Sequence, residues 1–220
     1  MRKLDIPYYL ELQRRLEEII LYISCHEDNF NTYSIKIENL FVDTCSFFDS
    51  LCQTFINEKH ASNHIFANQP LVKDFSNKLI GREFFNMGDY KILLSTEFGL
   101  AEKELNLNIY EDVYYGNPIA IFGPQTTLLG YKIRPFSNWN LSVLDWWASY
   151  TKLKHNRIEN IKVATFEMIL KSLGAVYIIL SLKNELDFKN GDISIELYNI
   201  FFPEYWEFKG RKMPGIVMWQ

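Results

Sequence analysis

The sequence predicts a mainly α-helical fold, a helical bundle with a small β element in its middle and a hairpin at its C-terminus. Two long segments before residue 60 and one around residue 170 repeat apolar residues every three or four positions, as helices with a buried face do. Strand and turn signals gather in one stretch, 109–136, where Gly116-Asn117-Pro118 and Gly123-Pro124 separate short β-prone runs. A chain of 220 residues fits one domain. We therefore predict a single helical domain, 1–220, with a β-containing insertion at about 109–136.

The composition is that of a compact globular protein. Hydrophobic residues make up 48% of the chain, which excludes a disordered protein. The net charge of −4 gives no overall attraction for phosphate, so contact with nucleic acid requires a local basic patch. Charged residues interrupt the first helical segment, and the most apolar run, 173–182, is about half the length of a bilayer span. We expect a cytoplasmic protein with no membrane segment.

The three cysteines predict neither a disulfide nor a metal site. Cys25, Cys45 and Cys52 form no C-x-x-C pair, and each lies within apolar residues at helical spacing. Free cysteine commonly behaves as a small buried hydrophobe. We expect buried thiols in a reducing compartment, and no motif for a cofactor is present.

Two helices are predicted in the N-terminal quarter. The first covers about Pro7 to Ser24, because proline is tolerated in an opening turn and apolar residues follow on one face. That face consists of Tyr9, Leu12, Leu16, Ile19 and Ile23. The second covers Ser34 to about Lys59, with the Ser34 hydroxyl as its N-cap.

The middle of the chain predicts shorter elements. Segments 71–80 and 90–96 have the composition of short helices, and a turn at 98–100 precedes a helical fragment at 101–104. Strands are predicted at 113–115, 119–122 and 128–133.

Two further helices follow. Ser142 precedes Asp145 by three residues, an arrangement close to a capping box, which predicts a helix starting near Val143. Asn160 is the predicted cap of the next helix, whose apolar face over 163–182 is so wide that other elements must surround it. Beyond it, 193–197 and 201–208 predict a short helix or strand and then the hairpin.

The segment from Trp146 to Arg157 combines aromatic rings, cations and a histidine. On a straight helix at about 100° per residue, one stripe contains Trp147, Tyr150, Lys154 and Arg157. Such a stripe can stack on a base while its cations, with Lys152, bind phosphate. In the alternative interpretation the two aromatics belong to the core and the Lys154 stem covers them.

His155 joins this group only if the helix ends before Arg157. On an uninterrupted helix the two residues lie about 200° apart. Asn156 favours a helix end, and the dipole of a last turn favours protonated histidine. His155 is then a candidate general acid or phosphate contact, and the alternative is that it only caps backbone carbonyls.

The Lys154-His155 pair lies in a helix that precedes a long apolar helix. This arrangement resembles that of the HEPN superfamily. Many members of that superfamily are linked to RNA cleavage in toxin or anti-phage systems. Active HEPN ribonucleases carry an arginine followed after four to six residues by a histidine, and here those positions before His155 hold Ala148, Ser149 and Tyr150. The resemblance implies an RNA-directed protein of a bacterial defence or toxin-antitoxin type system, as a divergent or inactive ribonuclease. His155 would be its catalytic acid or base, and Lys152, Lys154 and Arg157 would bind RNA or a nucleotide.

The competing hypothesis is a non-enzymatic helical module that contacts a protein partner. Helices with broad apolar faces often cover the surplus by pairing between copies, so we also predict a homodimer to which the Trp146-Trp147 pair contributes. If the RNA hypothesis holds, His155→Ala or Arg157→Ala should abolish RNA cleavage or RNA binding with little loss of stability. The module hypothesis instead predicts a stability loss when Trp147 or Tyr150 is truncated.

Overall fold

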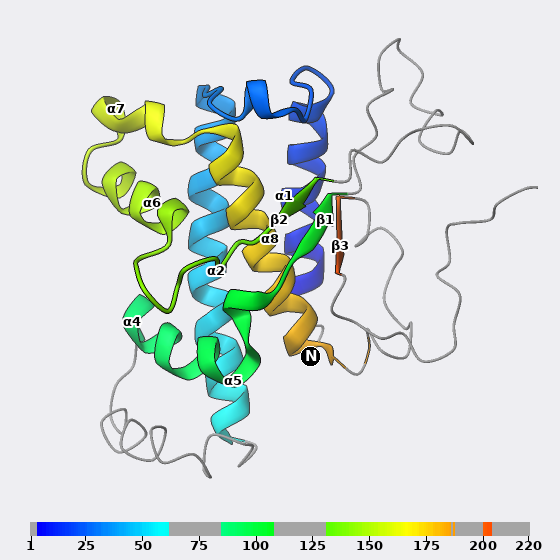
Figure 1. The fold of residues 1–220 in the computed structure, drawn as a ribbon, viewed down its shortest axis with the longest axis vertical. Helices are drawn as coiled ribbons and strands as arrows, with labels where there is room; N and C mark the ends of the chain where they lie inside the picture. Colours follow the sequence, from blue (N-terminus) through cyan, green and yellow to red (C-terminus); the bar gives the residue numbers. More distant parts are fainter. Residues whose placement is uncertain (1–3, 62–84, 108–130, 186, 188–199, 204–220) are drawn as a thin grey trace, which may run out of the picture.

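The fold is mainly α-helical, as predicted. The computed structural model describes residues 4–61, 85–107, 131–185, 187 and 200–203. Three long helices pack against one another: α1 (Asp5–Ile20), α2 (Ile35–Ala61) and α8 (Phe166–Lys183) (Figure 1). The shorter α6 (Asp145–His155) lies against α2 and α8.

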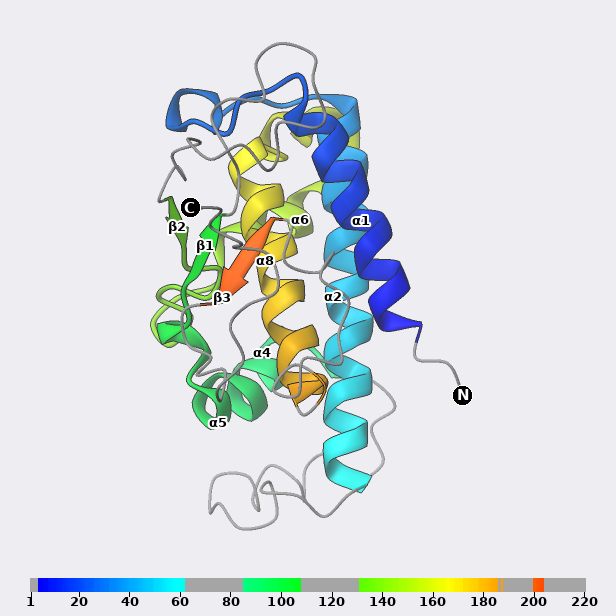
Figure 2. The same cartoon turned by 90° about the vertical axis from the view of Figure 1, so that its right-hand side faces the viewer.

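A small antiparallel sheet covers another side of α8 (Figure 2). Its strand order is β2-β1-β3, with Leu105 opposite Ile133 on one side and Leu107 opposite Phe201 on the other. The strands are β1 (Leu105–Leu107), β2 (Lys132–Ile133) and β3 (Phe201–Pro203). The remaining short elements are η1 (Glu27–Asn29), α4 (Met87–Tyr90), the π-helical turn η3 (Lys91–Ser95), α5 (Thr96–Phe98), η4 (Leu100–Glu102), α7 (Arg157–Asn160) and η6 (Ile161–Val163).

The first two helices bury the faces that their periodicity predicts. In α1 the side chains from Tyr9 to Ile19 on the predicted face are buried, but the helix ends at Ile20 rather than Ser24. It ends there because the amides of Tyr22 and Ile23 both donate to the Ile19 carbonyl. The turn is therefore tighter than an α-helical turn, and the helix does not continue. In α2 the Ser34 hydroxyl accepts a hydrogen bond from the Ile37 amide at 3.1 Å, so the predicted N-cap is confirmed.

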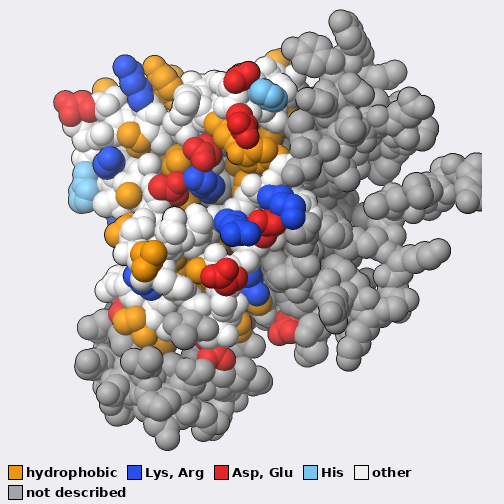
Figure 3. Space-filling view, viewed as in Figure 1, with side chains coloured by type: hydrophobic (Ala, Val, Ile, Leu, Met, Phe, Trp, Pro, Cys, Tyr) orange, Lys and Arg blue, Asp and Glu red, His pale blue; other side chains and the backbone are white. Residues whose placement is uncertain are grey.

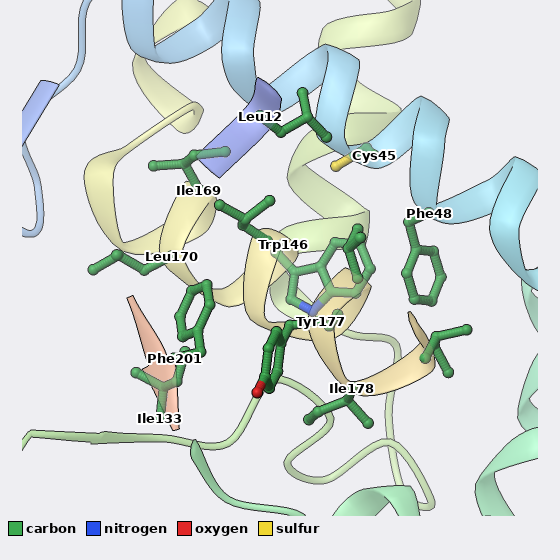
Figure 4. Packing of buried hydrophobic residues seen from close by; sticks show 14 of the residues in the cluster. Leu12, Cys45, Phe48, Ile133, Trp146, Ile169, Leu170, Tyr177, Ile178 and Phe201 are labelled. Atoms are coloured by element: carbon green, nitrogen blue, oxygen red, sulfur yellow. The ribbon is translucent and has the colours of Figure 1, made fainter. Parts of the chain in front are cut away.

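Helix α8 is the centre of the core. Every residue from Leu173 to Leu182 is buried, which confirms the prediction drawn from its wide apolar face. Figure 4 shows Tyr177 and Ile178 of α8 among side chains from the surrounding helices and strands, including Phe48 and Trp146. Its N-cap is Thr165, whose hydroxyl accepts from the Met168 amide at 3.4 Å. The prediction of Asn160 as the cap is therefore wrong, and Asn160 is the last residue of α7.

The last residue of α8 ties together the ends of two other helices. The ammonium of Lys183 lies 2.5 Å from a carboxylate oxygen of Asp5 in α1 and 3.3 Å from one of Glu58 in α2. Its side chain is only 2% exposed. A buried cation needs such partners, so this group fixes the relative position of the three long helices.

The sheet meets α8 at Gly174. A Cβ atom at this position would lie 2.9 Å from Cδ1 of Ile133, 3.1 Å from Cγ of Pro135 and 3.2 Å from Cδ1 of Leu105. Glycine weakens a helix interior, but here it permits the close approach of the strands. The requirement is for space, not for an unusual backbone angle.

Gly174→Ala is therefore expected to destabilise the protein. Overpacking costs about 1–3 kcal/mol, and alanine recovers about 1 kcal/mol of helix propensity, so we expect a net loss of up to about 2 kcal/mol. The free energy of unfolding from urea titration measures it. A variant that is as stable as the wild type would show that the strands move away from α8 at little cost.

Outside these elements the predictions had mixed success. The helical segment predicted at 90–96 lies within the run α4, η3 and α5, and the turn at 98–100 contains Gly99 with a φ of 56°. Strand β2 lies within the predicted strand 128–133, whereas β1 directly precedes the predicted β segment and was missed. The predicted elements at 71–80, 113–115, 119–122 and 193–197 lie outside the described residues. Of the C-terminal segment 201–208 only 201–203 are described, and they form β3, which pairs with β1, so the predicted hairpin itself lies outside the described residues.

The thiols are buried and unpaired, as expected. Cys25, Cys45 and Cys52 are free and buried, and burial raises the pKa of each, that of Cys25 to about 12. Within the described ranges, no three His, Cys, Asp or Glu side chains lie together as metal ligands would. None of the described helices combines the length and apolar character that a membrane span requires.

Candidate functional site

Helix α6, which carries the predicted site, is fixed at its start by a contact with α8. It begins at Asp145, and no side chain caps it, so the predicted capping box with Ser142 is wrong. The Asp145 carboxylate instead accepts from the Trp146 amide at 2.7 Å and binds the Lys171 ammonium of α8 at 2.6 Å. The Asp145 carboxylate thus makes a tertiary contact in place of the hydrogen bond that a capping box requires.

The helix ends at His155, as the sequence predicts. Asn156 is extended, with φ −151° and ψ 90°, and its side chain caps the short helix α7 by accepting from the Glu159 amide. Asn160 donates to the carbonyls of Asn156, at 2.8 Å, and Lys152, at 3.4 Å. Asn160 therefore satisfies carbonyls at the end of α6 instead of starting the next helix, and the helical stripe ends at Lys154.

Trp146 belongs to the core. It is fully buried, its Nε1 donates to the Pro135 carbonyl at 2.8 Å, and its ring meets Phe48 edge to face with centroids 5.0 Å apart. The expectation that it contributes to a dimer interface is wrong, because the protein's own side chains already cover it. Sequence position alone could not separate it from its neighbour Trp147.

Trp147 and Tyr150 are half-buried and lie against each other. Their ring centroids are 5.0 Å apart, and Trp147 also contacts Phe48 at 6.1 Å. Both pack against the core, and burial raises the pKa of the Tyr150 hydroxyl. Only part of each ring is accessible to a ligand. This partial burial favours the alternative interpretation, in which the two residues are core aromatics.

The exposed part of the site is cationic. Lys152, Lys154 and His155 occupy the last turn of α6, and Lys162 lies shortly after it; all four are exposed. Among the described residues none of these four side chains forms an ion pair or hydrogen bond. Positive charge is favourable at a helix C-terminus, so the basic side chains in the last turn of α6 need no ligand to be tolerated there. We call these four residues the cationic end of α6.

Arg157 is committed to a contact within the protein. Its Nη2 donates to Oε2 of Glu38 at 2.7 Å and to Oδ1 of Asn39, and its Nε forms an ion pair with Oε1 of Glu38. The Glu38 side chain is 3% exposed and that of Arg157 is 52% exposed. The hydrogen bond to Glu38 raises the pKa of Arg157. Arg157 therefore holds α7 against α2, while about half of its side chain still faces solvent.

No residue in the described part of the chain orients His155. Its side chain is exposed, and in the described part of the chain no side chain hydrogen bonds to its imidazole. A general acid or base must be held within hydrogen-bond reach of the reacting group, usually by a second residue. The arrangement can place a cation or a proton donor at the surface, but it does not assemble a catalytic pair.

A second concave site was not predicted from the sequence. A cleft of about 290 Å³ lies between β2 and the first turns of α8. Its wall is formed by Phe30, Glu104, Tyr131, Lys132, Ile133, Arg134, Ser137, Glu167, Leu170 and Lys171. The alternation of Lys132 and Arg134 about the buried Ile133 and the four-residue spacing of Glu167 and Lys171 were the available signals. Neither indicates that the two segments meet.

Comparison with known proteins adds no relative. No family model matches the sequence, and neither a curated protein nor a solved structure is significantly similar to the chain.

Proposed function

We propose that this chain is a HEPN-like RNA-directed protein, of a bacterial defence or toxin-antitoxin type system, that binds RNA through the cationic end of α6 without cutting it. The observation that carries the proposal is the exposure of Lys152, Lys154, His155 and Lys162 without acidic partners among the described residues. Half-buried Trp147 and Tyr150 lie on the same helix, and the exposed part of each ring is available for contact with a base.

Local charge supports the proposal more than the charge of the whole chain does. The net charge of −4 repels phosphate at long range, so binding must come from contacts within a Debye length of about 8 Å. Of the acids near the site, Glu38 is paired with Arg157, whereas Glu159 accepts only from the neutral Asn156 amide side chain at 2.6 Å and keeps its charge. The three exposed lysines therefore outnumber the one acid, Glu159, that lies beside them in sequence without a cationic partner among the described residues.

Binding without cleavage fits the site better than an active ribonuclease does. The arginine that HEPN ribonucleases place before their histidine is absent here. Arg157, the next arginine along the chain, is occupied by Glu38, and His155 has no described orienting partner. The chain thus corresponds to a divergent or inactive member of the family that it resembles.

The double variant Lys152→Ala/Lys154→Ala is expected to weaken binding of single-stranded RNA by about tenfold or more. Each lysine that neutralises a phosphate contributes a slope of about −0.7 to the dependence of log K on log salt, so the slope should become shallower by about 1.4. Fluorescence anisotropy with a labelled oligonucleotide at two salt concentrations measures both. Lys91→Ala, on η3 and outside the cationic end of α6, is the control and should bind as the wild type does.

The same preparations distinguish the remaining interpretations. RNA cleavage by the wild type that is lost in His155→Ala would overturn the non-cleaving assignment. Equal affinity of the double variant and the wild type would place any RNA contact elsewhere, and no RNA binding at all would sink the proposal.

The second candidate is the non-enzymatic interaction module, and Ile158 favours it. This side chain is 90% exposed on α7, between Arg157 and Glu159, where it gives a partner an apolar contact. Homodimerisation stays a prediction of the sequence, now without Trp146. Sedimentation that detects only monomer at high concentration would remove the dimer, and self-association lost in Ile158→Ser would support the module.

A further inference from the structure

The cleft between β2 and α8 combines an apolar floor with a charged rim. Phe30, Ile133 and Leu170 form the floor, and the Tyr131 ring meets Phe30 edge to face with centroids 5.0 Å apart. In Figure 3 apolar side chains in the middle of this face are bordered by groups of acidic and basic side chains. A flat apolar group fits such a floor, since aromatic rings pack well by edge and face.

Two ion clusters border the cleft. On the β2 side, Glu104 accepts from Nζ of Lys132 at 2.9 Å and from Nε of Arg134 at 2.8 Å. On the α8 side, Nζ of Lys171 binds Asp145 at 2.6 Å and Glu167 at 2.8 Å. These contacts fix the orientation of the rim side chains before any ligand arrives, which lowers the entropic cost of binding.

More donors than acceptors remain free at this rim. Both oxygens of Glu104 are occupied, whereas Arg134 engages only its Nε, so the two terminal nitrogens of its guanidinium have no partner in the described residues. Lys171 retains one ammonium proton, and Ser137 has a hydroxyl at the wall. The wall contains three cations and two carboxylates, and Asp145, which binds Lys171 at the rim, brings the formal charge of the whole group to zero.

We propose that this cleft binds a small organic monoanion, a carboxylate on a flat apolar body. The terminal nitrogens of Arg134 match a carboxylate in a bidentate contact, and Glu104 holds the guanidinium in place for it. The volume of about 290 Å³ lies at the lower end of the range for ligand sites and suits a single-ring compound. Glu104 and Glu167 disfavour a dianion such as a phosphate monoester, because a second negative charge would face both carboxylates. This site is separate from the cationic end of α6.

Titration calorimetry of the full chain with phenylacetate tests the proposal. We expect saturable binding of one molecule per chain, and binding of neutral phenylacetamide that is weaker by about tenfold or more, as loss of a charge-assisted contact implies. Arg134→Gln should weaken phenylacetate binding by a similar factor while leaving the melting temperature near that of the wild type. Lys154→Ala, outside the cleft, should leave phenylacetate binding unchanged.

A specificity change provides the second readout. Glu104→Gln removes one carboxylate and makes the wall more positive, so this variant should gain affinity for phenyl phosphate relative to phenylacetate. No saturable binding of phenylacetate, equal binding of the amide, or full binding by Arg134→Gln would each overturn the proposal. Its failure is distinguishable from failure of the RNA proposal, because Arg134→Gln should bind RNA normally and Lys152→Ala/Lys154→Ala should bind phenylacetate normally.

Discussion

Replacing Trp146 with alanine is expected to lower the free energy of unfolding by about 3–5 kcal/mol, the usual cost of removing a large buried side chain. The ring is fully buried among α2, α6 and α8, and its loss leaves a cavity between them. The Pro135 carbonyl also loses the Nε1–H donor that it accepts from. Urea denaturation followed by far-UV circular dichroism measures the change.

Its neighbour supplies the control. Trp147 has the same chemistry on the next position of the helix but is only half-buried, so Trp147→Ala should cost less than half as much. Trp146→Phe keeps most of the volume and removes the hydrogen bond, which separates packing from the polar contact. Equal losses for the two alanine variants would contradict the assignment of Trp146 alone to the core.

Arg157→Ala is expected to destabilise the protein by about 1–3 kcal/mol. Removing one partner of a buried pair costs about 3–5 kcal/mol, and the half-exposed position of Arg157 lets water reach the carboxylate and reduces that value. Without the Arg157 guanidinium, the Glu38 carboxylate is left buried with a negative charge and no cation beside it. The sequence led us to expect little loss of stability in this variant, whereas the contact with Glu38 predicts a clear loss.

A double-mutant cycle isolates the pair. Glu38→Gln removes the charge that Arg157 compensates, so Arg157→Ala should cost clearly less in that background than in the wild type. Equal costs in both backgrounds would show that Arg157 acts independently of Glu38. Because the single variant is destabilised, its RNA affinity should be measured only well below its melting temperature.

Local features of the fold could be predicted because their causes lie within a few residues. The Ser34 cap, the buried run in α8 and the end of α6 before Arg157 all follow from residue type and spacing along one helix. Strand β1 could not be predicted in this way. Its three residues are too few to show an alternation, and β2 and β3, distant in sequence, define it by pairing.

The candidate site could be predicted less well, since its properties depend on tertiary neighbours. Spacing placed Trp147, Tyr150 and Lys154 on one side of α6 but could not say that this side packs on Phe48. The partner of Arg157 lies 119 residues away, so no local pattern reveals that its charge is already used. The cleft is harder still, because its wall joins residues from four separate segments.

The buried position of α8 has a consequence for how the protein is made. The segments of α1 and α2 leave the ribosome first, whereas α8 begins only at Phe166. Until that segment emerges, side chains such as Leu16 and Phe41 lack the helix that covers them in the finished fold. Exposed apolar surface of this kind makes incomplete chains prone to associate. Nascent chains that stop before Phe166 are therefore natural clients for a chaperone, and the native core closes only after α8 has been made.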